Sequence, residues 1–320
     1  MTAKSRYGAL PTCALHASLS YGGAAPISTA LGEKQTAALS SLVAAVGLTT
    51  FKIVVGTLTG SLGILAEAAH SALDLMAAFV TFLAVRFSAR PPDRTHLYGH
   101  GKIENLSAMF ETVLLLATCL WIVREAVRRL VFHQIEVEVN FWSYAVMLTS
   151  IAIDASRSRV LARAAVKYHS QALEADALHF ATDIWSSSVV ILGLICVQAG
   201  AWFHTLAFLR EADAVAALGV SFVVVKISLK LGRRTIDALL DRAPDGMEQR
   251  VATAVEAVPG VRNCHQVRLR YSGPVLFIDL HVLVDGKQSL VQAHDLTEAI
   301  ENAIHEIAPQ SDVTVHPEPE

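Results

Sequence analysis

Six long apolar runs constrain the fold of this chain more than any other feature of its sequence. They cover residues 37–58, 62–87, 105–131, 141–165, 172–199 and 212–231. A helix that crosses the hydrocarbon core of a bilayer needs about 20 predominantly apolar residues, and each run is long enough. Apolar residues make up 53% of the chain and its mean hydropathy is +0.44, more than an ordinary soluble domain has. The sequence therefore predicts an α-helical polytopic membrane protein with six transmembrane helices.

The distribution of Lys and Arg predicts the orientation of these helices. Basic residues gather after the second, fourth and sixth runs, whereas the connection after the fifth run has only Arg210. Because cytoplasmic loops carry the excess of positive charge, both termini are predicted to be cytoplasmic, with the protein in the inner (cytoplasmic) membrane. Residues 1–36 lack an apolar run, so we expect a disordered cytoplasmic extension and not a signal peptide. Three arginines near the outer end of the third run oppose this orientation: Arg124, Arg128 and Arg129.

The hydropathy pattern changes after the predicted transmembrane domain at 37–236. DALLDRAPD (237–245) predicts a linker because it combines charged residues with a proline. Residues 246–320 then show an amphipathic helix, two alternating strands (CHQVRLR and PVLFIDLHVLV) joined by the turn YSG, a second helix at 289–308 and a short strand at 312–316. This order predicts a small αββαβ cytoplasmic domain of the α+β class.

Two histidine–aspartate pairs lie inside the apolar runs. AEAAHSALDL contains His70 and Asp74, and EADALHFATDIW contains His179 and Asp183. A helix places positions i and i+4 on the same face, so each pair directs an imidazole and a carboxylate to one side. Ionisable side chains within a membrane helix are energetically costly and point to function. Two imidazoles and two carboxylates suit a tetrahedral divalent ion such as Zn²⁺, so the sequence predicts a metal site within the membrane.

Several other classes of function lack support in the sequence. The net charge of −3 gives no reason to expect nucleic acid as a partner. The four cysteines form no CxxC pair, which argues against a disulfide framework and a thiolate metal cluster. The chain has no HExxH motif, no GxSxG motif and no Walker loop, so neither a zinc protease nor an ATP-driven pump is indicated, and no organic cofactor is expected.

The chain resembles the cation diffusion facilitator family of metal–proton exchangers over nearly its full length after residue 36. The resemblance is carried by SLGILAEAAHSALD in the second run, PPDRTHLYGHGKIE in the following loop, EADALHFATDIWSS in the fifth run and LLDRAPD before the C-terminal domain. A single HxxxD motif recurs by chance, but this combination is specific. The resemblance implies a homodimeric secondary transporter, not an enzyme. It also implies that His70, Asp74, His179 and Asp183 bind the transported metal, which is exchanged for protons and moved out of the cytoplasm.

The resemblance implies three further features outside the membrane site. Asp93, His96 and His100 match a second metal site in the loop, although Asp93 could instead cap a turn and His100 could be a structural loop residue. Lys102 and Asp241 match a salt bridge between the loop and the linker. Five residues of the C-terminal domain match a binuclear metal site, with Glu318 in place of an aspartate and Pro317 between two of them: His265, His281, His294, His316 and Glu318. Histidines of a small domain are also often bystanders.

The identity of the metal and two rival functions stay open at this point. His70 stands where many bacterial relatives carry Asp, and an extra imidazole favours Zn²⁺ over the harder Mn²⁺. Iron, cobalt, nickel and cadmium are not excluded by the type of ligand. One rival is an intramembrane metalloenzyme, in which only Glu67 could serve as general base. The other is a non-transporting metal sensor. Lys52 in the first run is expected to extend its ammonium group toward the membrane surface.

Overall fold

The chain forms six long helices followed by an αββαβ domain, which confirms the predicted fold class. The computed structural model describes residues 27–132, 141–202 and 212–320. The long helices are α1 (Ile27–Thr59), α2 (Leu62–Ser88), α3 (Lys102–Phe132), α4 (Phe141–Tyr168), α5 (Gln171–Trp202) and α6 (Ala212–Leu239). The C-terminal domain contains α7 (Met247–Glu256), β1 (Asn263–Ser272), β2 (Val275–Val284), α8 (Leu290–Ile307) and β3 (Ser311–Pro319).

The first helix begins earlier than predicted. α1 starts at Ile27, so the prediction of disorder is wrong for residues 27–36, and residues 1–26 lie outside the described part of the chain. This segment is too polar to resemble a membrane span, but its charges have partners on other helices. Lys34 pairs with Glu104 on α3, and Glu33 pairs with Lys167 on α4. At the other end of the bundle, α6 continues to Leu239, so the predicted linker is shorter by its first three residues.

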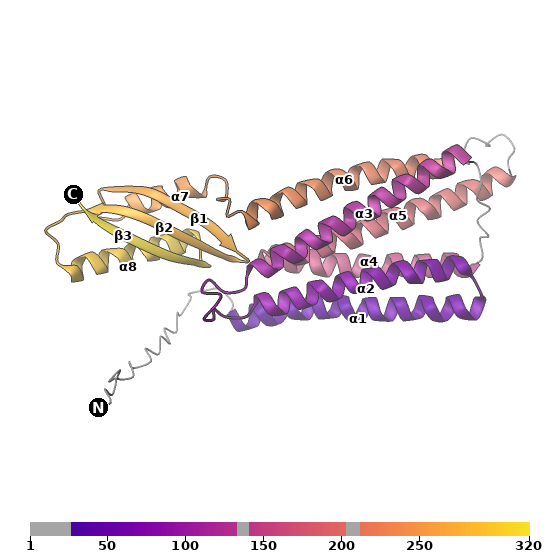
Figure 1. The fold of residues 1–320 in the computed structure, drawn as a ribbon, viewed down its shortest axis with the longest axis horizontal. Coiled ribbons are helices and arrows are strands. Elements are labelled where there is room, and N and C mark those ends of the chain that lie inside the picture. Colours follow the sequence, from indigo (N-terminus) through magenta and orange to yellow (C-terminus); the bar gives the residue numbers. More distant parts are fainter. Residues whose placement is uncertain (1–26, 133–140, 203–211) are drawn as a thin grey trace, which may run out of the picture.

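Two adjacent residues, Gly60 and Ser61, form the tight turn between α1 and α2. Gly60 has a φ of +66°, a conformation that glycine adopts without steric cost. Ser61 then caps α2, because its side chain accepts a hydrogen bond from the backbone N–H of Ile64. The two helices therefore run antiparallel and pack along their length (Figure 1), which fixes the position of the His70 and Asp74 face relative to α1.

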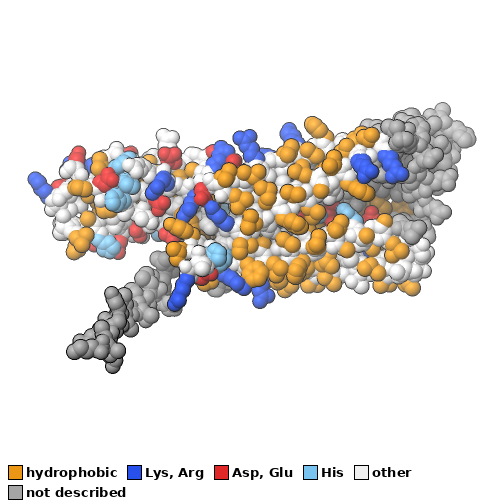
Figure 2. All heavy atoms as spheres, viewed as in Figure 1, with side chains coloured by type: hydrophobic (Ala, Val, Ile, Leu, Met, Phe, Trp, Pro, Cys, Tyr) orange, Lys and Arg blue, Asp and Glu red, His pale blue; other side chains and the backbone are white. Residues whose placement is uncertain are grey.

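The long helices form an elongated bundle with an apolar exterior. α3 and α6 pack against each other along one side, while α1 packs on α2 and α4 packs on α5 (Figure 1). Hydrophobic side chains cover much of the visible bundle surface in Figure 2, and Leu58, Leu120 and Phe222 are 82%, 71% and 74% exposed. Large apolar surfaces of this kind are rare on soluble monomers and suit a lipid environment. Three helical segments of the described chain meet length and hydropathy criteria for a membrane span: 32–59, 64–88 and 102–124.

The C-terminal domain is a two-layer structure of one sheet and two helices. The sheet order is β1-β2-β3, with β1 antiparallel and β3 parallel to β2. A parallel pair needs a crossover, and α8 provides it between β2 and β3. Buried side chains of the helices, such as Val251 and Ile300, meet buried strand residues such as Ile278, Leu280 and Val282 in one core. The alternation of apolar and polar residues along these strands is therefore explained by a sheet that has one face covered by helices.

The hairpin between β1 and β2 lies against the start of α3. A Cβ atom built on Gly101 would lie 2.3 Å from the backbone O of Ser272, so the two backbones touch. Beside this contact, the guanidinium of Arg270 lies over the ring of Tyr98, 4.2 Å from its centroid. The rings of Tyr98 and Phe277 are nearly perpendicular, with their centroids 5.3 Å apart. The loop before α3 therefore connects the helical bundle to the C-terminal domain through backbone and aromatic contacts.

We expect Gly101→Ala to loosen this junction. The added methyl group cannot fit unless the hairpin moves, because the nearest atoms are backbone atoms of Ser272 and Gly273. Hydrogen exchange of residues 97–101 and of the β1–β2 turn should become faster. Gly47→Ala on α1 is a matched control, since a methyl group added there has no neighbouring atom within 4 Å and alanine favours helix. Unchanged exchange in both variants would show that the junction does not depend on this close approach.

Candidate metal centre

Helices α2 and α5 bring both predicted histidine–aspartate pairs together inside the bundle. The Nε2 atom of His179 lies 3.2 Å from Oδ1 of Asp74 and 3.5 Å from Oδ2 of Asp183. The Nε2 atom of His70 lies 4.0 Å from the same Asp74 oxygen. His70, Asp74 and Asp183 also offer ligand atoms that all lie within 4.8 Å of one another. The i,i+4 spacing in each helix and the packing of α2 beside α5 thus produce one cluster of four side chains from two separate motifs.

The cluster is enclosed on the side of His179 and accessible on the side of His70. The side chain of His179 is 1% exposed, those of Asp183 and Asp74 are 12% and 13% exposed, and that of His70 is 42% exposed. A cation that enters from the His70 side would therefore lose water as it approaches His179. The two carboxylates and two imidazoles can replace that water with the oxygen and nitrogen ligands that borderline divalent ions accept.

Basic side chains lie buried in the same bundle. The prediction that Lys52 extends its ammonium group toward the membrane surface is wrong. Lys52 is 3% exposed and does not reach the membrane surface, because its ammonium donates to Ser71 Oγ at 2.7 Å and to Glu67 Oε2 at 3.2 Å. On α4, Arg157 donates to Asp154 Oδ1 at 3.1 Å. Fixed cations in the bundle offset part of the acidic charge near the cluster, which makes a concentration of carboxylates in an apolar setting tolerable.

Two buried carboxylates, Glu111 and Asp176, lie near the cluster, and neither is among its predicted ligands. Glu111 on α3 is 0% exposed and its Oε2 lies 3.8 Å from Nδ1 of His179. Asp176 lies one turn before His179 on α5 and is 1% exposed, so it is a core residue. The sequence contains a signal for both, since each is an ionisable residue inside an apolar run. Their neighbours, however, depend on how the helices pack.

The loop residues Asp93, His96 and His100 also meet. Asp93 lies 3.3 Å from Nδ1 of His96 and 3.4 Å from Nε2 of His100, and the three offer ligand atoms within 4.8 Å of one another. Asp93 also accepts hydrogen bonds from the backbone N–H groups of His96 and Thr95, at 2.7 and 2.8 Å. These hydrogen bonds hold the pKa of Asp93 below its usual range. The aspartate therefore both caps a turn and faces two imidazoles.

The sheet of the C-terminal domain aligns three of the predicted histidines across its strands. His265 pairs with His281 between β1 and β2, and His281 pairs with His316 between β2 and β3. Glu318 lies two residues beyond His316 on the same strand face, 2.7 Å from Nδ1 of His281 and 3.2 Å from Nε2 of His265. The hydrogen bond with His281 lowers the pKa of Glu318. His265, His281 and Glu318 offer ligand atoms within 4.8 Å of one another.

Strand alternation explains which neighbours of these residues stay outside the cluster. Pro317, between His316 and Glu318, belongs to the alternate position of β3, so it does not separate them. Cys264 lies in the domain core beside His265, and burial raises the pKa of its thiol to about 11. His294 is not brought to the cluster in the described structure. It lies on α8, its side chain is 69% exposed, and its Nε2 is 3.5 Å from Glu298.

The predicted pair Lys102 and Asp241 is in contact. The ammonium of Lys102 donates to Oδ1 of Asp241 at 2.8 Å, and Arg270 lies 3.7 Å from the other carboxylate oxygen. This pair joins the first residue of α3 to the segment after α6, next to the glycine contact of the hairpin.

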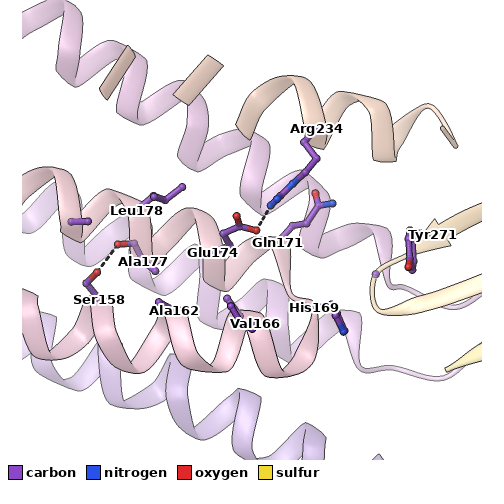
Figure 3. Close-up of a pocket in the computed structure, with 13 residues that line it drawn as sticks. Ser158, Ala162, Val166, His169, Gln171, Glu174, Ala177, Leu178, Arg234 and Tyr271 are labelled. Atoms are coloured by element: carbon purple, nitrogen blue, oxygen red, sulfur yellow. Dashed lines mark hydrogen bonds and ion pairs between the residues drawn. The ribbon is translucent and has the colours of Figure 1, made fainter. Parts of the chain in front are cut away.

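A cleft near the C-terminal domain is separate from all three clusters. It has a volume of about 660 Å³ and opens between α4, α5 and the end of α6, close to the β1–β2 turn (Figure 3). Alanines and valine form much of its wall, and an ion pair between Arg234 and Glu174 crosses it. None of the predicted metal ligands lines this cleft.

Known proteins match the chain over both parts of this architecture. The family model of the cation efflux transmembrane domain matches residues 38–240, and that of the cation efflux protein cytoplasmic domain matches residues 243–320. The cation-efflux pump FieF of Klebsiella pneumoniae (strain 342) is 33% identical over 286 residues, which is 88% of this chain and 92% of the relative. The FieF protein of Cronobacter sakazakii is 34% identical with the same coverage. The solved structure of MamM-CTD 215–293 is 30% identical, covers 24% of this chain and 98% of that chain, and has a TM-score of 0.23.

These matches extend from the first membrane helix to the last strand. The two family models together cover all six long helices and the C-terminal domain, apart from the first turns of α1. The chain therefore belongs to the cation efflux family of membrane transport proteins, also called the cation diffusion facilitators.

Proposed function

We propose that this protein is a divalent metal cation/proton antiporter that exports Zn²⁺ from the cytoplasm. The observation that carries the proposal is the convergence of His70, Asp74, His179 and Asp183 from two helices of a membrane domain. The Nε2 atom of His179 lies between carboxylate oxygens of Asp74 and Asp183, at 3.2 and 3.5 Å. Relatives of similar length are named cation-efflux pumps, which supports transport as the use of this cluster.

The chemistry of the four side chains supports exchange of metal for protons. A neutral imidazole nitrogen binds a metal ion, whereas a protonated one cannot, and carboxylates likewise bind the metal in their ionised form. Metal and protons therefore compete for His70, His179 and their aspartate neighbours. If the cluster faces alternate sides of the membrane, binding of protons on one side releases the metal there. A proton gradient can then drive export of the metal.

The ligand set supports zinc as the transported ion. Two imidazoles and two carboxylates fill a tetrahedral coordination sphere, which Zn²⁺ adopts readily. His70 contributes the second imidazole and is the most exposed of the four, so it is placed to meet the incoming ion. Iron, cobalt, manganese and cadmium are the alternatives within the same class of transporter.

The surroundings of Glu67 argue against an intramembrane metalloenzyme. A catalytic zinc site keeps one coordination position open and has a general base nearby. Glu67 is the candidate base, but its carboxylate lies 3.2 Å from the ammonium of Lys52, which holds it in an ion pair. No observation favours a sensor without transport, since all four ligands are present.

We also propose that the two domains have different functions. Residues 37–236 carry the transport site, and residues 246–320 form a cytoplasmic domain that binds metal at His265, His281, His316 and Glu318 and supports a homodimer. Both termini lie in the cytoplasm in this proposal. The family model that matches residues 243–320 describes a cytoplasmic domain, which supports this assignment.

The direct test is zinc uptake by proteoliposomes under an imposed pH gradient, compared between the wild type and Asp183→Ala. Transport that depends on both the gradient and Asp183 is the expected result. Zinc flux that is equal in the two proteins would refute the assignment of the site.

The C-terminal cluster has its own expected result. In an Asp183→Ala background, Glu318→Gln should weaken binding of Zn²⁺ to the cytoplasmic domain by about tenfold or more, because the carboxylate facing His265 and His281 loses its charge. Isothermal titration of the full-length protein measures the change. Glu306→Gln on the exposed face of α8 is the control and should leave the affinity unchanged. Equal affinities in both variants would show that Glu318 is not a ligand.

A further inference from the structure

We infer that Glu111 on α3 is a positioning residue for the transport site, because it holds the imidazole of His179 in the orientation and tautomer that bind metal. This inference rests on the proposed transport site and adds a third helix to it. The two relevant atoms, Nδ1 of His179 and Oε2 of Glu111, lie 3.8 Å apart. Shortening this distance by about 1 Å would produce a charge-assisted hydrogen bond.

The two nitrogens of His179 face different surroundings. Nε2 faces the carboxylates of Asp74 and Asp183, at 3.2 and 3.5 Å, on the side where a metal ion would bind. Nδ1 faces away from them toward Glu111. A neutral imidazole carries its hydrogen on only one nitrogen. If that hydrogen is on Nδ1 and is donated to Glu111, the lone pair of Nε2 is free for the metal.

Burial leaves Glu111 and His179 few other partners. Glu111 is 0% exposed and His179 is 1% exposed. Nδ1 of His179 and Oε2 of Glu111 are both buried without a hydrogen-bond partner in the described structure. Buried polar groups are almost always paired, so two unpaired atoms that face each other are expected to bond when the metal draws His179 into its final position. Ligating histidines commonly donate their second N–H to a carboxylate.

The other oxygen of Glu111 is held by a side chain of helix α2. Thr81 on α2 donates from Oγ1 to Glu111 Oε1 at 3.3 Å, and the same hydroxyl lies 3.4 Å from Oγ of Ser107 on α3. The carboxylate therefore has one oxygen fixed to α2 and the other aimed at α5. This arrangement differs from a chance polar contact, because each oxygen has its own neighbour and the side chain has no access to water.

Transport kinetics of Glu111 variants in proteoliposomes test the inference. Glu111→Leu removes the acceptor and should raise the apparent KM for Zn²⁺ by about 10–100-fold, the usual effect of losing such a partner. Glu111→Gln keeps a carbonyl oxygen that can accept from Nδ1 and should retain most of the affinity. Thr81→Val should raise KM by a smaller factor. Thr118→Val is its control, since that hydroxyl donates to Leu114 O within α3 and has no partner on another helix among the described residues. An unchanged KM in Glu111→Leu, or equal effects of Leu and Gln, would overturn the inference.

A second measurement does not depend on the folding of the Leu variant. In ¹⁵N-histidine NMR of the zinc-loaded wild type, the His179 signal, assigned by its loss in His179→Gln, should show a protonated Nδ1. A protonated Nε2 with metal on Nδ1 would overturn the inference.

Asp183→Ala is measured in parallel with the Glu111 variants in the transport assay. If Asp183→Ala stops transport while Glu111→Leu does not change KM, the transport site stands and only the role of Glu111 is refuted. If Asp183→Ala transports normally, the site itself is wrong.

Discussion

Zinc uptake driven by a pH gradient is expected to fall to background in Asp183→Ala. Asp183 supplies one of two carboxylates in the cluster and lies 3.5 Å from Nε2 of His179. In the proposed tetrahedral zinc site, its loss removes one of the four ligands. The effect should exceed the roughly 10–100-fold loss that follows removal of an outer partner, because a direct ligand is gone. Radioactive zinc or an internal zinc-sensitive dye measures the flux in proteoliposomes.

An exposed carboxylate provides the control for this variant. Asp245 lies after α6 and its side chain is 93% exposed, so Asp245→Ala makes the same change of charge outside the bundle. Transport by Asp245→Ala should match the wild type. If Asp183→Ala and Asp245→Ala transport zinc at the same rate, the cluster of α2 and α5 is not the transport site.

Replacing His70 with aspartate is expected to change the choice of metal and to preserve transport. The variant keeps four ligands but exchanges an imidazole for a carboxylate, and hard oxygen ligands suit Mn²⁺ better than nitrogen ligands do. We expect the ratio of transport efficiencies, zinc over manganese, to fall by about tenfold or more, which corresponds to about 1.4 kcal/mol of discrimination. His70 is the most exposed of the four side chains, so this exchange should disturb packing less than a change at His179.

The same exchange at an exposed histidine shows whether the position matters. His169 follows α4, is exposed, and has a φ of +49°, a conformation that aspartate tolerates. His169→Asp should leave the zinc-to-manganese ratio unchanged. An unchanged ratio in His70→Asp as well would show that the second imidazole does not select the ion.

The sequence predicts those features of the protein that depend on regular periodicity. The apolar runs predict the six long helices, and the i,i+4 spacing places His70 with Asp74 and His179 with Asp183 on single faces. Strand alternation likewise predicts that Cys264 and His265 point to opposite faces of the sheet. These features can be predicted without knowing which helices and strands pack against each other.

Features that depend on packing between distant segments are not predictable in this way. The polar start of α1 becomes helical while Lys34 pairs with Glu104, a residue seventy positions later. Lys52 is buried because Ser71 and Glu67 on α2 accept its hydrogen bonds. Glu111 faces His179 only because α3 packs beside α5. In each case the partner comes from another helix, and local hydropathy contains no information about it.

Zinc and protons are proposed to exchange at the cluster of His70, Asp74, His179 and Asp183. The most direct test records zinc entry and internal pH in the same proteoliposomes, with one dye for each ion. We predict that zinc entry raises the internal pH in a fixed ratio, that the ratio holds when the imposed gradient is varied, and that both signals vanish in Asp183→Ala. Zinc entry with no change of internal pH would contradict the account, as would coupled flux that survives the loss of Asp183.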